Sequence, residues 1–141
     1  MRSNRPTDSA PELALRRVLH RDGLRYRLHV RIPTNRRPVR VDLVFPRARV
    51  AVFVDGCFWH ACPRHATWPR RHGRWWRVKL AENIARDVRQ TAALRAAGWR
   101  VLRIWAHEDP MVAARRVRCA VGRRQSRSVR AVSSRADQSS R

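Results

Sequence analysis

The 141-residue chain has few acidic residues, almost no lysine and no long hydrophobic run. Only 10 aspartates and glutamates stand against 33 basic residues, all of which except Lys79 are arginines. The net charge of +23 indicates a polyanionic partner, and nucleic acid is the default class. A genome rich in G and C would explain the preference for arginine over lysine, but it would not explain the shortage of acids.

The sequence also lacks segments that direct proteins into or across membranes. No apolar stretch is long enough for a membrane span, and the N-terminus has no hydrophobic segment of the signal-peptide kind. We therefore expect a cytoplasmic protein that has no membrane partner.

Cysteine is scarce, and the distribution of the three cysteines does not suit a disulfide framework. Cys57, Cys62 and His65 have the spacing C-x4-C-x2-H, in a loop too short to build a core of its own. Structural Zn²⁺ takes four nitrogen or sulfur ligands in a closed tetrahedron, so the spacing predicts a zinc-bound loop whose fourth ligand lies elsewhere in the chain. The alternative is that these cysteines are small buried hydrophobes and the histidine a surface group. Cys119 is expected to play no part.

Hydrophobic periodicity predicts one α/β domain over residues 8–120. It lies between a basic arm at residues 1–7 and a basic, disordered tail at residues 121–141. Residues 111–120 fit either a short helix or the tail.

A first helix is expected to begin at Ser9, where Ser9 and Glu12 have the spacing of a capping box, and to end at Gly23. A helix between the last two predicted strands makes that pair parallel, so the sheet is mixed. The remaining predicted elements are strands at 24–30, 41–45, 49–54 and 99–105 and a long helix at 75–97.

Asp42 is an acid inside an apolar strand. Only three residues separate the strands at 41–45 and 49–54, which predicts an antiparallel hairpin that brings Asp42 within roughly 7–8 Å of residues 52–55. A buried carboxylate is costly, and carboxylates are preferred ligands of Mg²⁺. Asp42 is therefore a candidate for holding a catalytic Mg²⁺, and the alternative is an edge-strand aspartate that faces solvent.

Several motifs in register resemble the very short patch repair (Vsr) family of DNA mismatch endonucleases. The central motif is Val54-Asp55-Gly56-Cys57-Phe58-Trp59-His60. The others, in chain order, are Thr7-Asp8-Ser9-Ala10-Pro11-Glu12-Leu13, Gly23-Leu24-Arg25-Tyr26-Arg27, Asn83-Ile84-Ala85-Arg86-Asp87 and Gly98-Trp99-Arg100-Val101-Leu102-Arg103-Ile104-Trp105.

The resemblance implies a restriction-endonuclease-like mixed β-sheet flanked by helices, with a zinc-bound loop and an Mg²⁺-dependent nicking site. The implied reaction is hydrolysis of the DNA backbone 5′ of the thymine in T·G mismatches that arise when 5-methylcytosine is deaminated. The implied setting is the bacterial nucleoid, with other DNA-repair proteins as candidate partners. Two alternatives stay open: a related Mg²⁺-dependent DNA endonuclease with another target, and a catalytically inactive zinc-containing DNA-binding module.

The resemblance also implies metal ligands. Zinc would be held by Cys57, Cys62 and His65, with His107 as the fourth ligand. Mg²⁺ would be held by Asp42 and the main-chain carbonyl of Val54.

The implied catalytic residues besides Asp42 are His60, which acts on the attacking water, and Asp87, which assists. Asp55 stands where the best-known members have histidine, so it could be a second metal ligand, an orienter of His60 or an inert residue. Glu12 matches an acidic position near the family's active site, although the capping box explains it equally well.

Aromatic side chains beside the zinc loop are implied to enter the duplex next to the mismatch, which is how some proteins unstack base steps. These are Phe58, Trp59 and Trp76. For each of them the alternative is a place in the core. Phosphate contacts are expected from Arg25, Arg27, Arg36 and Arg37.

Overall fold

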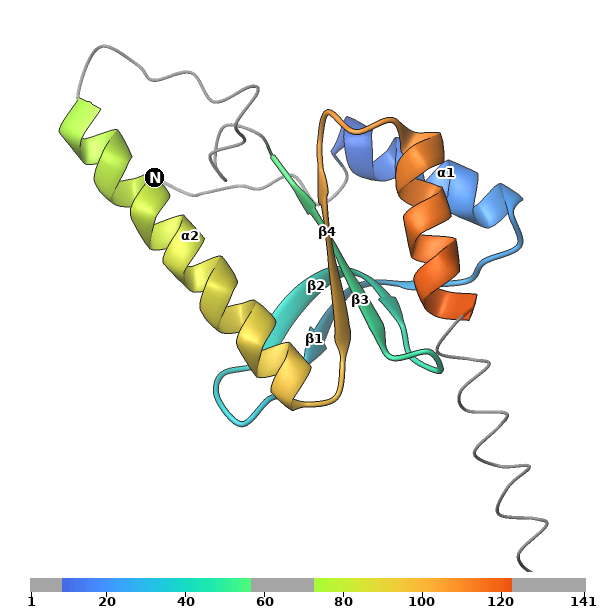
Figure 1. Ribbon diagram of the computed structural model, residues 1–141, viewed down its shortest axis with the longest axis horizontal. Coiled ribbons are helices and arrows are strands. Elements are labelled where there is room, and N and C mark those ends of the chain that lie inside the picture. Colours follow the sequence, from blue (N-terminus) through green and yellow to red (C-terminus); the bar gives the residue numbers. More distant parts are fainter. Residues whose placement is uncertain (1–8, 57–72, 123–141) are drawn as a thin grey trace, which may run out of the picture.

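The computed structural model describes two segments of the chain, residues 9–56 and 73–122. The elements in these two segments form a four-stranded mixed sheet with three helices (Figure 1). In chain order they are α1 (Ala10–Arg21), β1 (Arg27–Ile32), β2 (Val39–Phe45), β3 (Val50–Asp55), α2 (Gly73–Ala96), β4 (Arg100–Trp105) and a helix over residues 110–122. Within the described segments, no helix meets the length and hydrophobicity that a membrane span requires.

The strand order is β1-β2-β3-β4, in which β2 pairs antiparallel with both β1 and β3, and β4 pairs parallel with β3. The predicted hairpin between β2 and β3 is confirmed, as is the parallel pair that the crossover helix α2 makes necessary. The four predicted strands are all present, with ends that differ by a few residues. The loop that was predicted to bind zinc lies outside the described residues.

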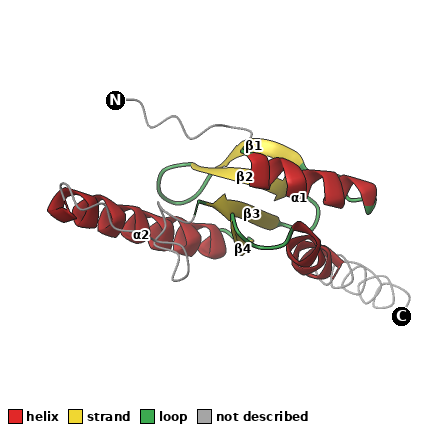
Figure 2. Ribbon diagram, turned by 90° about the horizontal axis from the view of Figure 1, so that it is seen from above, coloured by secondary structure: helices red, strands yellow, loops and turns green. Residues whose placement is uncertain are grey.

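The sheet is covered on both faces (Figure 2). On one face, Leu15 and Leu19 of α1 and Val117 of the last helix pack with Val52 and Val54 of β3. On the other face, Leu94 of α2 packs with Phe53 of β3 and Val101 of β4. Every residue of β3 is buried, because this central strand is paired on both edges and covered on both faces.

The long helix α2 packs on the sheet through only part of its length. Leu80 and Leu94 are buried, as their helical spacing predicts, but Ile84 is 44% exposed and Val88 is 64% exposed. These four residues have the spacing of one helical face, but the middle of that face is exposed. Figures 1 and 2 show that the N-terminal part of α2 projects beyond the sheet.

The helix over residues 110–122 resolves a choice that the sequence left open. Asp109 accepts a hydrogen bond at its Oδ1 from the main-chain N of Met111, 2.8 Å away, and Pro110 occupies the first turn, both typical of a helix start. Val121 is 3% exposed and belongs to the core, so ordered structure continues past the expected domain boundary at residue 120.

Candidate active site

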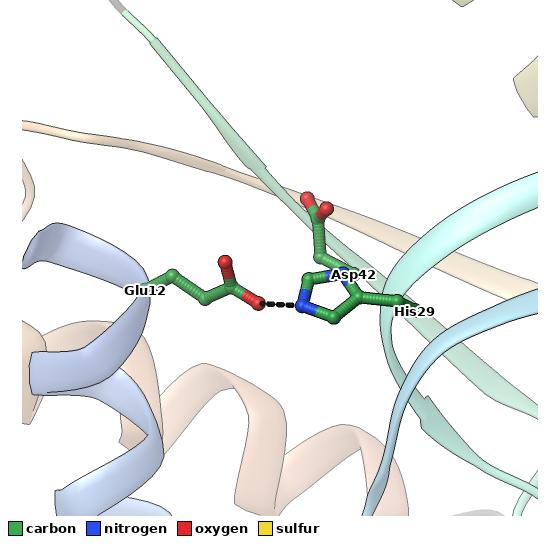
Figure 3. A group of neighbouring side chains, drawn as sticks. All are labelled: Glu12, His29 and Asp42. Atoms are coloured by element: carbon green, nitrogen blue, oxygen red, sulfur yellow. Dashed lines mark ion pairs between the residues drawn. The ribbon is translucent and has the colours of Figure 1, made fainter. Parts of the chain in front are cut away.

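Three side chains from three elements meet on the α1 face of the sheet (Figure 3). Glu12 comes from α1, His29 from β1 and Asp42 from β2. One oxygen or nitrogen atom of each lies within 4.8 Å of the corresponding atoms of the other two. Glu12 Oε1 and His29 Nε2 are 3.4 Å apart.

Glu12 reaches this cluster because it does not cap its own helix. Ser9 occupies the N-cap position, as predicted, but its side chain makes no capping hydrogen bond, so the capping-box interpretation is wrong. Glu12 instead points from the first turn of α1 toward β1 and is only 3% exposed. A carboxylate is expensive to bury unless other groups compensate its charge, which favours the functional interpretation of Glu12.

His29 lies at a point where β1 and β2 both switch faces. Leu28 pairs with Leu43 and packs on the α1 face, whereas the next pair, Val30 with Val41, packs on the α2 face. In a regular strand, residues two apart share a face, so the backbone between them must turn. His29 has a φ of 49°, in the left-handed region, which histidine enters more readily than most residues.

The same register places His29 opposite Asp42, between these two flanking pairs. Sequence reasoning missed His29 because it follows Arg25 and Arg27 at every second position, the pattern of a polar strand face. The pairing of β1 with β2 was the signal that could have found it, because that register sets an imidazole against the aspartate.

Asp42 lies where the predicted hairpin puts it. Its Oδ2 accepts a hydrogen bond from the main-chain N of Val54 at 2.8 Å, which confirms that Asp42 reaches the end of β3. This bond also orients the carboxylate, because it fixes one of the two oxygens against the β3 backbone.

The donor set of Glu12, His29 and Asp42 fits a divalent cation. It offers two carboxylates, which suit hard ions, and one imidazole. Donors on one octahedral ion of Mg²⁺ size are about 3 Å apart when adjacent and about 4.2 Å apart when opposite. The observed separations of 3.4 Å for one pair and at most 4.8 Å for all are close to those values.

Asp55 and Asp87 belong to a different cluster, on the α2 face. Both oxygens of Asp55 accept hydrogen bonds from Arg103 Nη1 at 3.2 Å, and the same nitrogen is 3.8 Å from Asp87 Oδ1. Arg103 also donates from Nε to Thr91 Oγ1 at 3.1 Å and lies over the ring of Phe53. Sequence reasoning missed Arg103, although the parallel register pairs it directly with Phe53.

His107, the expected fourth zinc ligand, is exposed just after β4. Its ring stacks on that of Trp105 with centroids 6.5 Å apart, and it lines a cleft of about 460 Å³ together with Val54 and Pro11. Its expected partners in the zinc site, and three further candidates, lie outside the described residues. These are Cys57, Cys62, His65, His60, Phe58 and Trp59.

The candidate DNA contacts fall into two groups. Arg27, Arg36 and Arg37 are exposed. Arg25 donates from Nη1 to the main-chain oxygens of His20 at 3.1 Å and Leu24 at 3.2 Å, so it also holds the end of α1.

Trp76 is half-buried at the start of α2 and meets the edge of Trp75, with centroids 4.7 Å apart. Trp75 itself is 51% exposed. The described part of the molecule therefore presents an aromatic pair at the end of α2 that projects beyond the sheet.

Comparisons with known proteins agree on one family. A family model described as DNA mismatch endonuclease Vsr matches residues 1–65. The type II nicking enzyme V.NaeI of Lentzea aerocolonigenes is 44% identical over 111 residues, which cover 77% of this chain and 66% of that enzyme. The type II nicking enzyme V.XorIIP of Xanthomonas oryzae pv. oryzae is 42% identical over 110 residues, 77% of each chain. The DNA mismatch endonuclease Vsr of Escherichia coli K12 is 33% identical over 109 residues, 74% of this chain and 65% of that enzyme.

Proposed function

Because this chain belongs to the Vsr family of DNA mismatch endonucleases, we propose that it is a divalent-metal-dependent endonuclease that nicks duplex DNA. The observation that carries the proposal is the cluster of Glu12, His29 and Asp42, whose donor atoms converge within 4.8 Å beside the end of β3. The net charge of +23 supports a polyanionic substrate.

Asp42, with Glu12 close by and the carbonyl of Val54, would hold Mg²⁺. Bound Mg²⁺ neutralises charge that develops on a phosphodiester and makes a bound water easier to deprotonate. His60 would take the proton of the attacking water. Asp87 would assist indirectly, because the network that it forms with Arg103 and Asp55 holds α2 against the end of β3.

The preferred substrate in this proposal is a T·G mismatch, cut on the 5′ side of the thymine. A mispaired step costs less to open than a matched one, so aromatic side chains that enter the duplex favour mismatches energetically. Phe58, Trp59 and Trp76 would do this, and Arg27, Arg36 and Arg37 would contact phosphates. Trp76 is half-buried beside the exposed Trp75 at the start of α2, and this position is compatible with such a role.

A structural zinc completes the proposal. Cys57, Cys62, His65 and His107 would bind Zn²⁺ and attach the loop after β3 to the end of β4. His107 lies in the turn just after β4, where its ring stacks on that of Trp105. The nickase would act at the nucleoid in the bacterial cytoplasm, before repair proteins that remove and refill the nicked strand.

A second candidate is a nicking enzyme of the same chemistry with another target. It is favoured by the names of V.NaeI and V.XorIIP, which are called type II nicking enzymes and are more similar to this chain than the E. coli mismatch endonuclease. The two candidates differ in substrate and not in the site.

The test is nicking of end-labelled duplexes with and without one T·G mismatch, in Mg²⁺ and in EDTA. We expect Mg²⁺-dependent cutting of one strand beside the mismatched thymine, lost in Asp42→Asn and kept in the control Asp22→Asn, which changes an aspartate at the end of α1. Equal cutting of matched duplexes would favour the second candidate. Equal cutting by Asp42→Asn and the unaltered protein would refute the assigned site.

A further inference from the structure

We propose that His29 is a nitrogen ligand of the catalytic divalent ion, so that this site combines two carboxylates with one imidazole. The inference rests on the proposed function, because it concerns the ion that Asp42 would hold. It assigns a role to a strand residue that the motifs of the sequence did not single out.

The position of His29 carries the first step. Its Nε2 lies 3.4 Å from Glu12 Oε1, and one donor atom each of His29, Glu12 and Asp42 lies within 4.8 Å of the other two. Figure 3 shows the imidazole pointing from β1 toward Glu12 of α1, with the Asp42 carboxylate above the ring in this view. An ion bound by Asp42 and Glu12 would therefore lie within reach of the ring.

The backbone carries the second step. The left-handed φ of 49° at His29 lies where Leu28 and Val30 pack on opposite faces of the sheet. In a regular strand, Leu28 and Val30 would share one face and residue 29 would lie on the other. Here Leu28 and Val30 lie on opposite faces, so the backbone turns at residue 29. The turn is what lets residue 29 face α1 and Glu12.

The third step rests on the contacts of Asp55. Asp55, at the end of β3, pairs with Arg103 on the α2 face. Asp55 is thus committed to a guanidinium on the other side of the sheet. The imidazole that the structure places beside Asp42 comes from β1.

An imidazole changes which ions a site prefers. Carboxylates and carbonyls suit Mg²⁺ and Mn²⁺, whereas imidazole raises the affinity for Co²⁺, Ni²⁺ and Zn²⁺ more than that for Mg²⁺. Removing the nitrogen should therefore cost affinity for Co²⁺ more than affinity for Mg²⁺.

The test uses the full-length protein and its variants His29→Gln, His29→Asn and His20→Gln. Asparagine tolerates the left-handed region, so His29→Asn preserves the backbone if glutamine does not. His20 is an exposed histidine of α1 and serves as the matched control. The readouts are Co²⁺ and Mg²⁺ binding by calorimetry and the nitrogen couplings of bound Mn²⁺ in pulsed electron paramagnetic resonance.

We expect both His29 variants to lose one coordinated nitrogen from Mn²⁺ and to bind Co²⁺ at least about 10-fold more weakly, with Mg²⁺ affinity changed less than about 3-fold. The control should match the unaltered protein. Unchanged nitrogen couplings in folded His29→Asn would overturn the inference while leaving the proposed function intact, provided that Asp42→Asn abolishes Mn²⁺ binding. If Asp42→Asn also binds Mn²⁺ normally, both the inference and the proposed metal site fail.

Discussion

Two clusters of acids lie on opposite faces of the sheet, and they differ in the base that accompanies them. On the α2 face, Asp55 and Asp87 surround the guanidinium of Arg103. On the α1 face, Glu12 and Asp42 surround the imidazole of His29. A guanidinium is permanently charged and has no lone pair to offer, whereas a neutral imidazole can bind a metal ion through nitrogen.

This difference in the accompanying base suggests a structural role for the cluster on the α2 face and a metal-binding role for the cluster on the α1 face. Arg103 brings its own positive charge to Asp55 and also holds α2 through the main-chain oxygen of Asp87 at 3.2 Å, so this cluster joins elements. The cluster of Glu12, His29 and Asp42 presents donors that suit a divalent ion. We therefore expect its removal to affect metal binding and nicking, and removal of the Arg103 cluster to affect folding.

The largest expected effect compares Asp42→Asn with Asp55→Asn in the nicking assay. Asp42→Asn should lower the rate at least about 1,000-fold, equivalent to about 4 kcal/mol of transition-state stabilisation, because it removes a carboxylate from the metal site. Asp55→Asn should lower it less than about 10-fold, since this acid acts through Arg103. Equal losses in the two variants, both folded by circular dichroism, would contradict the assignment of metal binding to the α1 face and of a structural role to the α2 face.

The second prediction concerns stability. Arg103→Met leaves Asp55, which is 3% exposed, without its guanidinium, and should lower the free energy of unfolding by about 2–4 kcal/mol. This loss is somewhat smaller than the loss of about 3–5 kcal/mol that is typical of breaking a fully buried pair, because the Arg103 side chain is 25% exposed.

Urea unfolding is the measurement, and Arg100→Met, an exposed arginine of the same strand, is the control, expected within about 0.5 kcal/mol of the unaltered protein. A loss below about 1 kcal/mol in Arg103→Met would show that the α2 cluster is not structural.

The third prediction tests the other buried acid. Glu12→Gln keeps the shape of the side chain but removes its charge, so the Mg²⁺ concentration for half-maximal nicking should rise about 10–100-fold, and high Mg²⁺ should restore part of the rate. The control is Glu82→Gln, an exposed glutamate of α2. An unchanged Mg²⁺ dependence in Glu12→Gln would return Glu12 to a purely structural role.

The sequence predicted the sheet well because strand patterns and hairpin length are local properties. It placed the hairpin from β2 to β3 and the reach of Asp42 to the end of β3 correctly. It failed where tertiary packing overrides a local pattern. The capping spacing of Ser9 and Glu12 was misleading, because Glu12 turns inward to the sheet instead of back to its own helix.

The missed residues share a cause. His29 depends on the register of β1 against β2 and on a left-handed backbone, and Arg103 depends on the parallel pairing of β3 with β4. Neither pairing partner is near in sequence. A period-two pattern cannot show that a strand switches faces partway along, which is what brings His29 to Asp42.

The smallest expected effect concerns the salt dependence of DNA binding. It compares an arginine that is bonded within the protein with arginines that are exposed and open to a ligand. Arg36 and Arg37 are exposed in the loop between β1 and β2, whereas Arg25 is bonded to two main-chain oxygens at the end of α1. Arg36→Gln and Arg37→Gln should each reduce the slope of log binding constant against log salt concentration by about 1, as the loss of one phosphate contact predicts. Arg25→Gln should change that slope less and instead lower the free energy of unfolding by about 0.5–1.5 kcal/mol.

Fluorescence anisotropy of labelled duplex across a salt series measures the slopes. Arg25→Gln could instead change the slope as much as the two loop variants do. That result would show that Arg25 contacts phosphate although it also holds the end of α1. Structural and ligand-binding roles would then not be separate among the arginines, as they are between the two acidic clusters.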